Sequence, residues 1–239
     1  MPDHTAWCAG YPRSGTSLVR LILAHCFGHR TASVYNESRM SAGYMHAVRG
    51  VPSSGDLEAF QLLGAQQGWL FWKTHSCLTD VLQRPAIVIV RDGRRVLQSL
   101  KHFLPIYNFA NIAMRDLILG HHPWGSWSRW VRSWEEHAGD KALWLRYENV
   151  VADVPGTVDR IASAFGLVPI AQAIPSFDAL HAAEPNIWRA GDAETNGGMS
   201  PEDEALFWTL HGAAMGRHGY SKGSAALLKR RYKRGGGEE

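Results

Sequence analysis

The stretch Ala86-Ile-Val-Ile-Val90 limits the possible folds more than any other part of this sequence. Its residues are all apolar and mostly β-branched, without the polar alternation of a strand that has one face in water. This pattern is typical of a strand buried on both faces, which lies inside a parallel sheet covered by helices on either side. The sequence therefore predicts an α/β fold of three layers with a central parallel sheet.

Other segments continue this alternation of short strands and helices. Further strands are expected at residues 5–9, 69–73 and 142–146, and helices at residues 16–27, 56–67, 94–103, 109–119, 154–165 and 201–217. The last helix begins with Ser200 as its N-cap and Pro201 at its first position. No linker or internal repeat interrupts the pattern, so we expect a single domain over residues 1–239.

The net charge of +3 is unevenly distributed. Residues 229–234 carry +5 while Glu238 and Glu239 carry −2, so this tail contributes +3 and the rest of the chain is neutral. A neutral body with a basic, glycine-containing tail is typical of a solvated terminus and argues against a nucleic-acid partner. We expect the tail, residues 229–239, to be flexible.

The chain carries no pattern that would take it to a membrane or a secretory route. No apolar run approaches the ~20 residues of a membrane span, and the first residues lack the pattern of a signal peptide. The cysteines are odd in number and far apart, which favours reduced thiols in the cytoplasm over disulfides or a zinc site. They are Cys8, Cys26 and Cys77.

A glycine-containing turn separates the first expected strand from the first expected helix. The segment Tyr-Pro-Arg-Ser-Gly-Thr-Ser, residues 11–17, places backbone N–H groups at a helix N-terminus, where an anion can bind. Counted from Gly10 it reads G-x-x-x-x-G-T-S, close to the phosphate loop of nucleotide-binding enzymes. The lysine of that loop is missing because Thr16 stands in its place, and the basic residue is Arg13 instead. Alone, the segment also fits a capping turn with a surface arginine.

Two more strand ends carry polar residues suited to chemistry on an anionic substrate. Arg91 leaves the apolar strand, and Ser99 follows eight residues later on the next helix. Lys73-Thr74-His75 closes the strand expected at residues 69–73. A histidine can accept a proton near neutral pH, and a lysine can stabilise developing negative charge. A lone histidine at a strand end is also often purely structural.

In this order the motifs resemble those of the sulfotransferases that use 3′-phosphoadenosine 5′-phosphosulfate (PAPS), of the cytosolic and bacterial type. The resemblance implies a nucleotide-kinase-like fold and a loop that holds the 5′-phosphosulfate. By the family pattern Y-P-K-S-G-T-T-W, the loop residues are Arg13, Ser14, Gly15, Thr16 and Ser17. By R-x-P-x-D-x-x-x-S, Arg91 and Ser99 hold the 3′-phosphate. By K-T-H, His75 is the base, while Lys73 and Arg13 contact the transferring group.

Three shorter fragments resemble the same family. Tyr147, followed by Glu148, is similar to the F-x-Y-E-D segment whose tyrosine meets adenine. Phe177 is similar to the phenylalanine of a T-S-F fragment that contacts the nucleoside. The residues Arg189, Ala190 and Gly191 resemble the R-K-G loop over the 3′-phosphate.

The chain also departs from the family pattern. Arg13 replaces the loop lysine, and the planar guanidinium group is no geometric equivalent of an ammonium group. Leu18 replaces a tryptophan that stacks on adenine in the family, so this position provides no aromatic ring for that half of the adenine clamp. Gly93 and Arg95 replace the proline and aspartate of the 3′-phosphate motif, and Ala190 replaces a lysine.

A tryptophan-rich segment follows the middle of the chain. Trp127, Trp130, Val131 and Trp134 recur at helical spacing on one face, which favours core packing over a ligand cage. The adjacent histidines at positions 121 and 122 point apart on a helix and have no third ligand nearby, so we interpret them as a surface pair.

The resemblance implies transfer of a sulfuryl group from PAPS to a hydroxyl of a small acceptor, with 3′-phosphoadenosine 5′-phosphate (PAP) as product and no metal ion. One alternative is a kinase-like phosphotransferase using ATP, which needs a magnesium carboxylate, and Asp92 is the one candidate. Another is a non-catalytic nucleotide-binding protein. The intact Lys73 and His75 favour an enzyme, and His102 is the next candidate for the base.

The acceptor is not identified by any motif. Loops at residues 35–55 and 104–125 are expected to line its site with Tyr44, Phe103, Tyr107 and Phe109. These aromatic residues favour an aromatic or amphiphilic hydroxyl compound, with a sugar hydroxyl as second choice. The family's dimerisation pattern, K-x-x-x-T-V-x-x-x-E, is missing, so the oligomeric state stays open.

Overall fold

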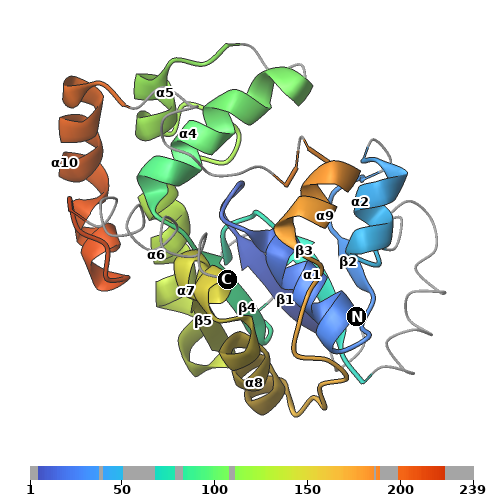
Figure 1. Cartoon of the computed structure of the whole chain (residues 1–239). Helices are drawn as coiled ribbons and strands as arrows, with labels where there is room; N and C mark the ends of the chain where they lie inside the picture. The colour runs from blue at the N-terminus through green and yellow to red at the C-terminus, as the bar shows by residue number, and fades with distance from the viewer. Residues whose placement is uncertain are drawn as a thin grey trace, which may run out of the picture.

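The apolar run at residues 86–90 forms strand β4 (Ala86–Val90), and all of its residues are buried. In the computed structural model, which describes residues 5–37, 40–50, 68–78, 83–107, 111–185, 187–188 and 199–223, β4 lies inside a five-stranded sheet. The strand order is β2-β3-β1-β4-β5, and every pairing is parallel (Figure 1). The other strands are β1 (Thr5–Gly10), β2 (Thr31–Ser33), β3 (Leu70–Thr74) and β5 (Ala142–Arg146).

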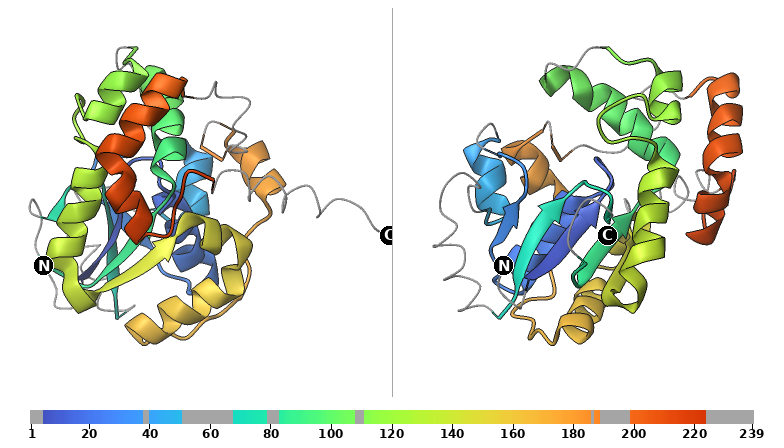
Figure 2. Two further views of the ribbon diagram at one scale, coloured as in Figure 1. Left: turned by 90° about the vertical axis from the view of Figure 1, so that its left-hand side faces the viewer. Right: turned by 180° about the vertical axis from the view of Figure 1, so that it is seen from behind.

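One face of the sheet is covered by helices from the middle and the end of the described chain. They are α4 (Gly93–Phe103), α5 (Met114–Leu119), α6 (Trp127–Ala138) and α10 (Pro201–Arg217). Figure 2 shows α10 against α5 and α6 on the outer side of this layer. The tryptophan face predicted for core packing is confirmed, because Trp127, Trp130 and Trp134 are at most 1% exposed.

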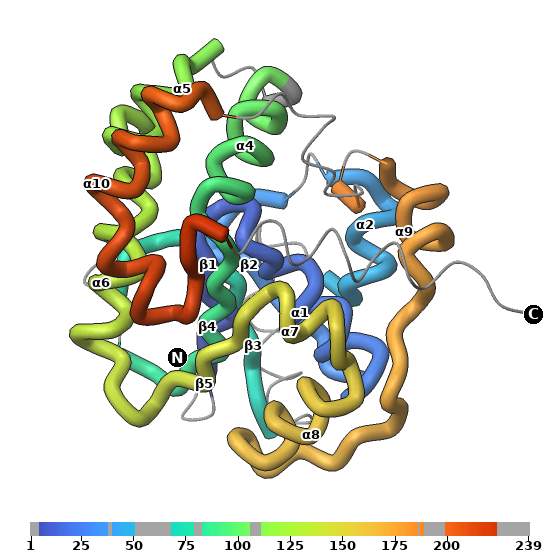
Figure 3. Tube along the Cα trace, turned by 60° about the vertical axis from the view of Figure 1, so that its left-hand side comes forward, coloured from blue at the N-terminus to red at the C-terminus, as the bar shows by residue number. Residues whose placement is uncertain are grey.

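The opposite face is covered by a second group of helices. They are α1 (Thr16–Cys26), α2 (Ala42–Ala47), α7 (Tyr147–Ala152), α8 (Val154–Phe165) and α9 (Phe177–Ala183). Figure 3 shows α2 beside α9, away from α6 and α10. The three-layer α/β prediction is confirmed. Leu18, at the position of the missing tryptophan, lies in the core of this layer.

The expected elements mostly match, and the differences have physical causes. The helix expected at residues 109–119 starts only at Met114, where Ala113 provides an extended N-cap, and a 3₁₀ helix (Leu104–Tyr107) precedes it. The elements β2, α2, α7 and α9 were not predicted, because three to seven residues are too few for a clear periodicity. The helix expected at residues 56–67 and the tail at 229–239 lie outside the described residues.

Because the strands are parallel, their carboxyl ends meet at one edge, where open α/β sheets bind ligands. The register pairs Ala9 with Thr74 and Gly10 with Ile89, so the segments that follow β1, β3 and β4 start side by side. Each of the main sequence motifs follows one of these strand ends. Within the described ranges, no helix has the length and apolar character that a membrane crossing requires.

Candidate functional site

The loop between β1 and α1 has the backbone shape of an anion-binding turn. Arg13 has a positive φ of 71°, and Gly15 has a φ of 110°. Gly15 is also the N-cap of α1 and has no side chain that could accept a hydrogen bond from the first turn. The amide of Leu18 donates to the carbonyl oxygen of Gly15 at 2.9 Å, so the amides of Thr16 and Ser17 are those that can face an anion. A Cβ atom at Gly15 would lie 2.6 Å from Cδ2 of Tyr147, so a larger residue would displace the tyrosine ring.

Predicted site residues from several segments of the chain meet beside this loop. The Nε of Arg13 donates a hydrogen bond to Oγ of Ser99 at 3.1 Å, and its guanidinium group lies 4.3 Å from the centre of the Phe103 ring. Arg91 donates to the carbonyl oxygen of Arg13 at 3.3 Å and lies 4.2 Å from the centre of the Tyr147 ring. Two cations and two aromatic rings therefore lie beside the N-terminus of α1.

The turn after β4 is held by contacts that the sequence did not predict. Asp92 caps α4 and binds the guanidinium group of Arg94 at 2.7 Å. The backbone N–H of Asp92 donates to Glu148 at 3.2 Å, and the hydroxyl of Tyr220 donates to the same carboxylate at 2.6 Å. Glu148 and Tyr220 therefore fix the turn from which Arg91 projects, although no motif marks Tyr220.

His75, directly after β3, has its imidazole orientation fixed by the backbone. Its Nδ1 lies 2.6 Å from the carbonyl oxygen of Gly10, so Nδ1 carries the proton and donates. Nε2 is then the basic atom, and it has no hydrogen-bond partner among the described residues. The Tyr35 ring stacks on the imidazole, and Trp130 donates to the carbonyl oxygen of His75 at 2.9 Å.

The surroundings of His75 keep its imidazole neutral. Burial, and after it the positive charge of Lys73, lowers the pKa of His75 to about 3. The hydrogen bond to Gly10 acts in the opposite direction, while Arg13 and Arg20 lower the pKa further. The predicted base and the two predicted cations are thus close enough to influence one another's charge.

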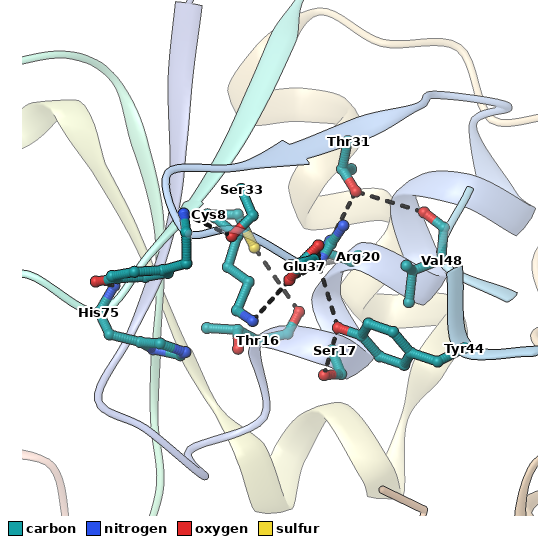
Figure 4. A network of polar contacts seen from close by, with 12 residues as sticks. Cys8, Thr16, Ser17, Arg20, Thr31, Ser33, Glu37, Tyr44, Val48 and His75 are labelled. Atoms are coloured by element: carbon teal, nitrogen blue, oxygen red, sulfur yellow. Dashed lines mark hydrogen bonds and ion pairs between the residues drawn. The ribbon is translucent and has the colours of Figure 1, made fainter. Parts of the chain in front are cut away.

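Lys73 belongs to a buried network of charges (Figure 4). Its Nζ donates to Oε1 of Glu37 at 2.9 Å, and Arg20 binds both oxygens of the same carboxylate at 2.8 and 2.9 Å. Arg20 also donates to Thr31 at 2.7 Å and to the hydroxyl of Tyr44 at 3.1 Å. Glu37 and Arg20 were not predicted, because nothing in the local sequence shows that these side chains meet.

Two sequence interpretations are wrong. Tyr44 is 1% exposed and bonds to Arg20 and Ser17, so it belongs to the core rather than to an acceptor site. His122 is not part of a surface pair, because it is partly buried and its Nε2 lies 3.0 Å from the hydroxyl of Tyr11. Its neighbour His121 is exposed, as expected.

The remaining predicted residues are not joined to this cluster. Phe177 begins α9, is 45% exposed and stacks on His181, and no contact described in the structure links it to the loop at Arg13. Arg189, Ala190, Gly191 and Phe109 lie outside the described residues. The cysteines at positions 8, 26 and 77 are free thiols.

The arrangement defines a class: an α/β enzyme that binds an anionic nucleotide at the carboxyl edge of its sheet. The family model named Sulfotransferase domain matches residues 3–174, so the chain belongs to the sulfotransferase family, whose members use PAPS as sulfuryl donor. No curated protein matches the sequence.

The solved structures that share the fold include two complexes with PAP. Mouse sulfotransferase SULT7A1, complexed with PAP, has a TM-score of 0.65 and 18% identity, covering 98% of this chain and 90% of that one. Retinol dehydratase, in a complex with retinol and PAP, has a TM-score of 0.59 and 16% identity, covering 90% and 82%.

Proposed function

We propose that this sulfotransferase moves the sulfuryl group of PAPS directly to a hydroxyl of a small acceptor, with His75 as the general base. The observation that carries the proposal is the hydrogen bond between Nδ1 of His75 and Gly10. It makes Nε2 the proton acceptor, next to Lys73 and at the same sheet edge as Arg13.

The residues of the loop and of the turn after β4 fit the two phosphate groups of the donor. The uncapped first turn of α1, from Gly15 to Ser17, suits the 5′-phosphosulfate together with Ser14 and Arg13. Arg91 and Ser99 suit the 3′-phosphate, and the Tyr147 ring between Gly15 and Arg91 suits adenine. Phe177, Arg189, Ala190 and Gly191 stay in this proposal as further nucleotide contacts on the family pattern.

The chemical step requires one base and a concentration of positive charge. The acceptor oxygen forms a bond to sulfur while the bond between sulfur and the bridging phosphate oxygen breaks, with its electron pair left on that oxygen. Nε2 of His75 takes the hydroxyl proton. Lys73 and Arg13 stabilise the charge on the sulfuryl oxygens and on the departing phosphate, without a covalent intermediate.

The ATP-dependent alternative lacks support at the residue it needs most. A kinase-like site requires a free carboxylate for magnesium, and Asp92 was the candidate. Asp92 is 3% exposed and engaged with Arg94 at 2.7 Å. Its carboxylate serves to cap α4 and to anchor Arg94.

For the acceptor we favour an aromatic or amphiphilic hydroxyl compound, with a sugar second. Phe103 lies against Arg13 at the edge of the site and offers an apolar surface for such a compound. The related retinol dehydratase structure contains retinol, an amphiphilic alcohol. The three free thiols suit the cytoplasm as the location.

A labelled-donor screen tests this proposal. The chain is incubated with ³⁵S-labelled PAPS and one of three probe acceptors: 2-naphthol, dodecanol or glucose. We expect transfer, fastest to one of the first two, and unchanged rates in excess EDTA, because Arg13 and Lys73 supply the positive charge. A parallel reaction with γ-labelled ATP and magnesium is the control. Transfer of phosphate but not of sulfate, or a rate that EDTA abolishes and magnesium restores, would contradict the proposal.

A further inference from the structure

We propose that Glu37 is a positioning residue for sulfuryl transfer, which holds the Lys73 ammonium group in place and leaves two of its N–H bonds for the sulfuryl oxygens. The inference rests on the proposed role of Lys73 in the reaction. Glu37 belongs to none of the sequence motifs, and its function follows from where the fold puts its carboxylate.

The Lys73–Glu37 contact is short and shielded from water. Nζ and Oε1 are 2.9 Å apart, and the two side chains are 13% and 3% exposed. An ammonium group has three N–H donors, and among the described residues Glu37 is the one side-chain acceptor that Lys73 reaches. A lysine side chain is long and flexible, so a fixed partner reduces the conformations it must lose when the donor binds.

Glu37 can act as a fixed partner because it is itself held. Arg20 binds both of its oxygens, and the Nε of Arg20 is held in turn by Thr31. Burial raises the pKa of Glu37, but the charges of Lys73 and Arg20 outweigh this effect, so its pKa lies below the usual value and the carboxylate stays ionised. Two cations and one anion leave a net charge of +1 for an anionic substrate.

The network also reaches both parts of the proposed site. The Tyr44 hydroxyl contacts Arg20 and lies 3.1 Å from Oγ of Ser17 in the donor loop. At the other end, Lys73 is near enough to lower the pKa of His75. Figure 4 shows the Arg20–Glu37 pair lying between Thr31 and Tyr44, with His75 on the far side of Ser33.

The test replaces the carboxylate with a neutral amide, Glu37→Gln, and separates turnover from binding. With saturating PAPS and the fastest acceptor of the screen, we expect turnover to fall by at least ~10-fold, because Lys73 loses its ionic partner. Calorimetry should give a Kd for PAP within ~3-fold of wild type, because PAP has no sulfuryl group for Lys73 to bind. The matched control is Glu135→Gln, which also removes a Glu–Arg ion pair. Glu135 and its partner Arg217 both lie in the helical layer on the other face of the sheet, so turnover should be unchanged.

A double-mutant cycle distinguishes positioning from support of the fold. If Glu37 acts through Lys73, adding Glu37→Gln to Lys73→Gln should slow turnover by no more than ~2-fold. An equal loss in both backgrounds, or a Glu37→Gln variant that keeps more than about a third of wild-type turnover, would overturn the inference. A Lys73→Gln variant with full turnover would overturn the proposed role of Lys73 as well.

A second variant decides the question if Glu37→Gln does not fold. Glu37→Asp keeps a negative charge for the buried Arg20 but draws the carboxylate back by about 1.5 Å, one carbon–carbon bond. The circular dichroism spectrum of Glu37→Asp should match that of wild type, and its turnover should fall below about a third of the wild-type value. A folded Glu37→Asp variant with higher turnover would overturn the inference.

Discussion

At the edge where the carboxyl ends of the strands meet, the residues after β4 and those after β3 are held in different ways. On the β4 side, Arg13 donates to the hydroxyl of Ser99, Arg91 donates to the carbonyl oxygen of Arg13, and both guanidinium groups lie over aromatic rings. On the β3 side, Lys73 is in a buried ion pair, and the neutral His75 is held by backbone. The difference fits the proposed roles, in which the β4 side binds phosphate and the β3 side positions the groups that react.

The largest expected effect separates the reacting side from the binding side. His75→Ala should lower turnover by ~10²–10⁴, the usual contribution of a general base. Glutamine at this position should not restore it, because an amide cannot accept the proton. The Kd for PAP should stay within a few fold of wild type, as measured by calorimetry.

His102, which is exposed on α4, provides the comparison for this experiment. His102→Ala should keep wild-type turnover. If His75→Ala retains more than a tenth of wild-type turnover while His102→Ala loses it, the base is on the other side of the edge.

The second effect is expected on the β4 side. Arg91→Ala should weaken PAP binding by roughly 10- to 150-fold, because a charge-assisted contact contributes about 1.5–3 kcal/mol. Binding of the nucleotide without the 3′-phosphate should change little, and calorimetry with both nucleotides measures the difference. Equal losses for the two nucleotides would show that Arg91 supports the fold rather than the 3′-phosphate.

The smallest expected effect concerns the protonation of the His75 imidazole, which should occur well below neutral pH. Because burial and Lys73 lower the pKa of His75 to about 3, its imidazole should stay neutral from pH 8 to pH 5. Histidine-selective NMR can follow it, with His75→Gln to assign the signal. Lys73→Gln should shift the titration to higher pH because a nearby positive charge is lost.

Arg91→Ala also removes one positive charge, but on the β4 side. It should leave the pKa of His75 unchanged, since Arg91 is not among the groups that change this pKa. A shift as large as that of Lys73→Gln would contradict the distinction between the two sides.

The lowered pKa of His75 also makes the folded protein less stable in acid. Below about pH 6.5 the unfolded histidine binds a proton that the folded one does not, so stability should fall as the pH drops toward 3.

The sequence predicted the parts of the site that depend on local pattern. The strand at residues 86–90 and the turn at Gly15 each depend on a short run of consecutive residues. The parallel sheet, and the edge at which it binds ligands, could therefore be inferred from the sequence. Arg13 and Ser99 meet because β1 and β4 are neighbours; the sequence predicted that their segments share one edge of the sheet, whereas the strand order comes from the structure.

What the sequence missed are partners joined only by packing. Glu37 lies in a loop without periodicity, so nothing indicated that Arg20 and Lys73 both reach it. The N–H of Trp130 gave no sign that it holds the backbone at His75, although its burial was predicted. Tyr44 was assigned to an acceptor site because it is an aromatic residue in an expected loop. The same pattern is compatible with core packing, and in the structure the Tyr44 hydroxyl accepts a hydrogen bond from the buried Arg20.

The contact between Tyr220 and Glu148 bears on the order in which the enzyme is completed during translation. Every strand of the sheet is synthesised before Tyr220 leaves the ribosome, and the nascent chain folds as it emerges. Until then Glu148 lacks its hydroxyl donor, and Arg94 lacks the carbonyl oxygens of Ser221 and Lys222. The nascent chain therefore contains every strand of the sheet before the contacts that hold the turn at Arg91 can be complete.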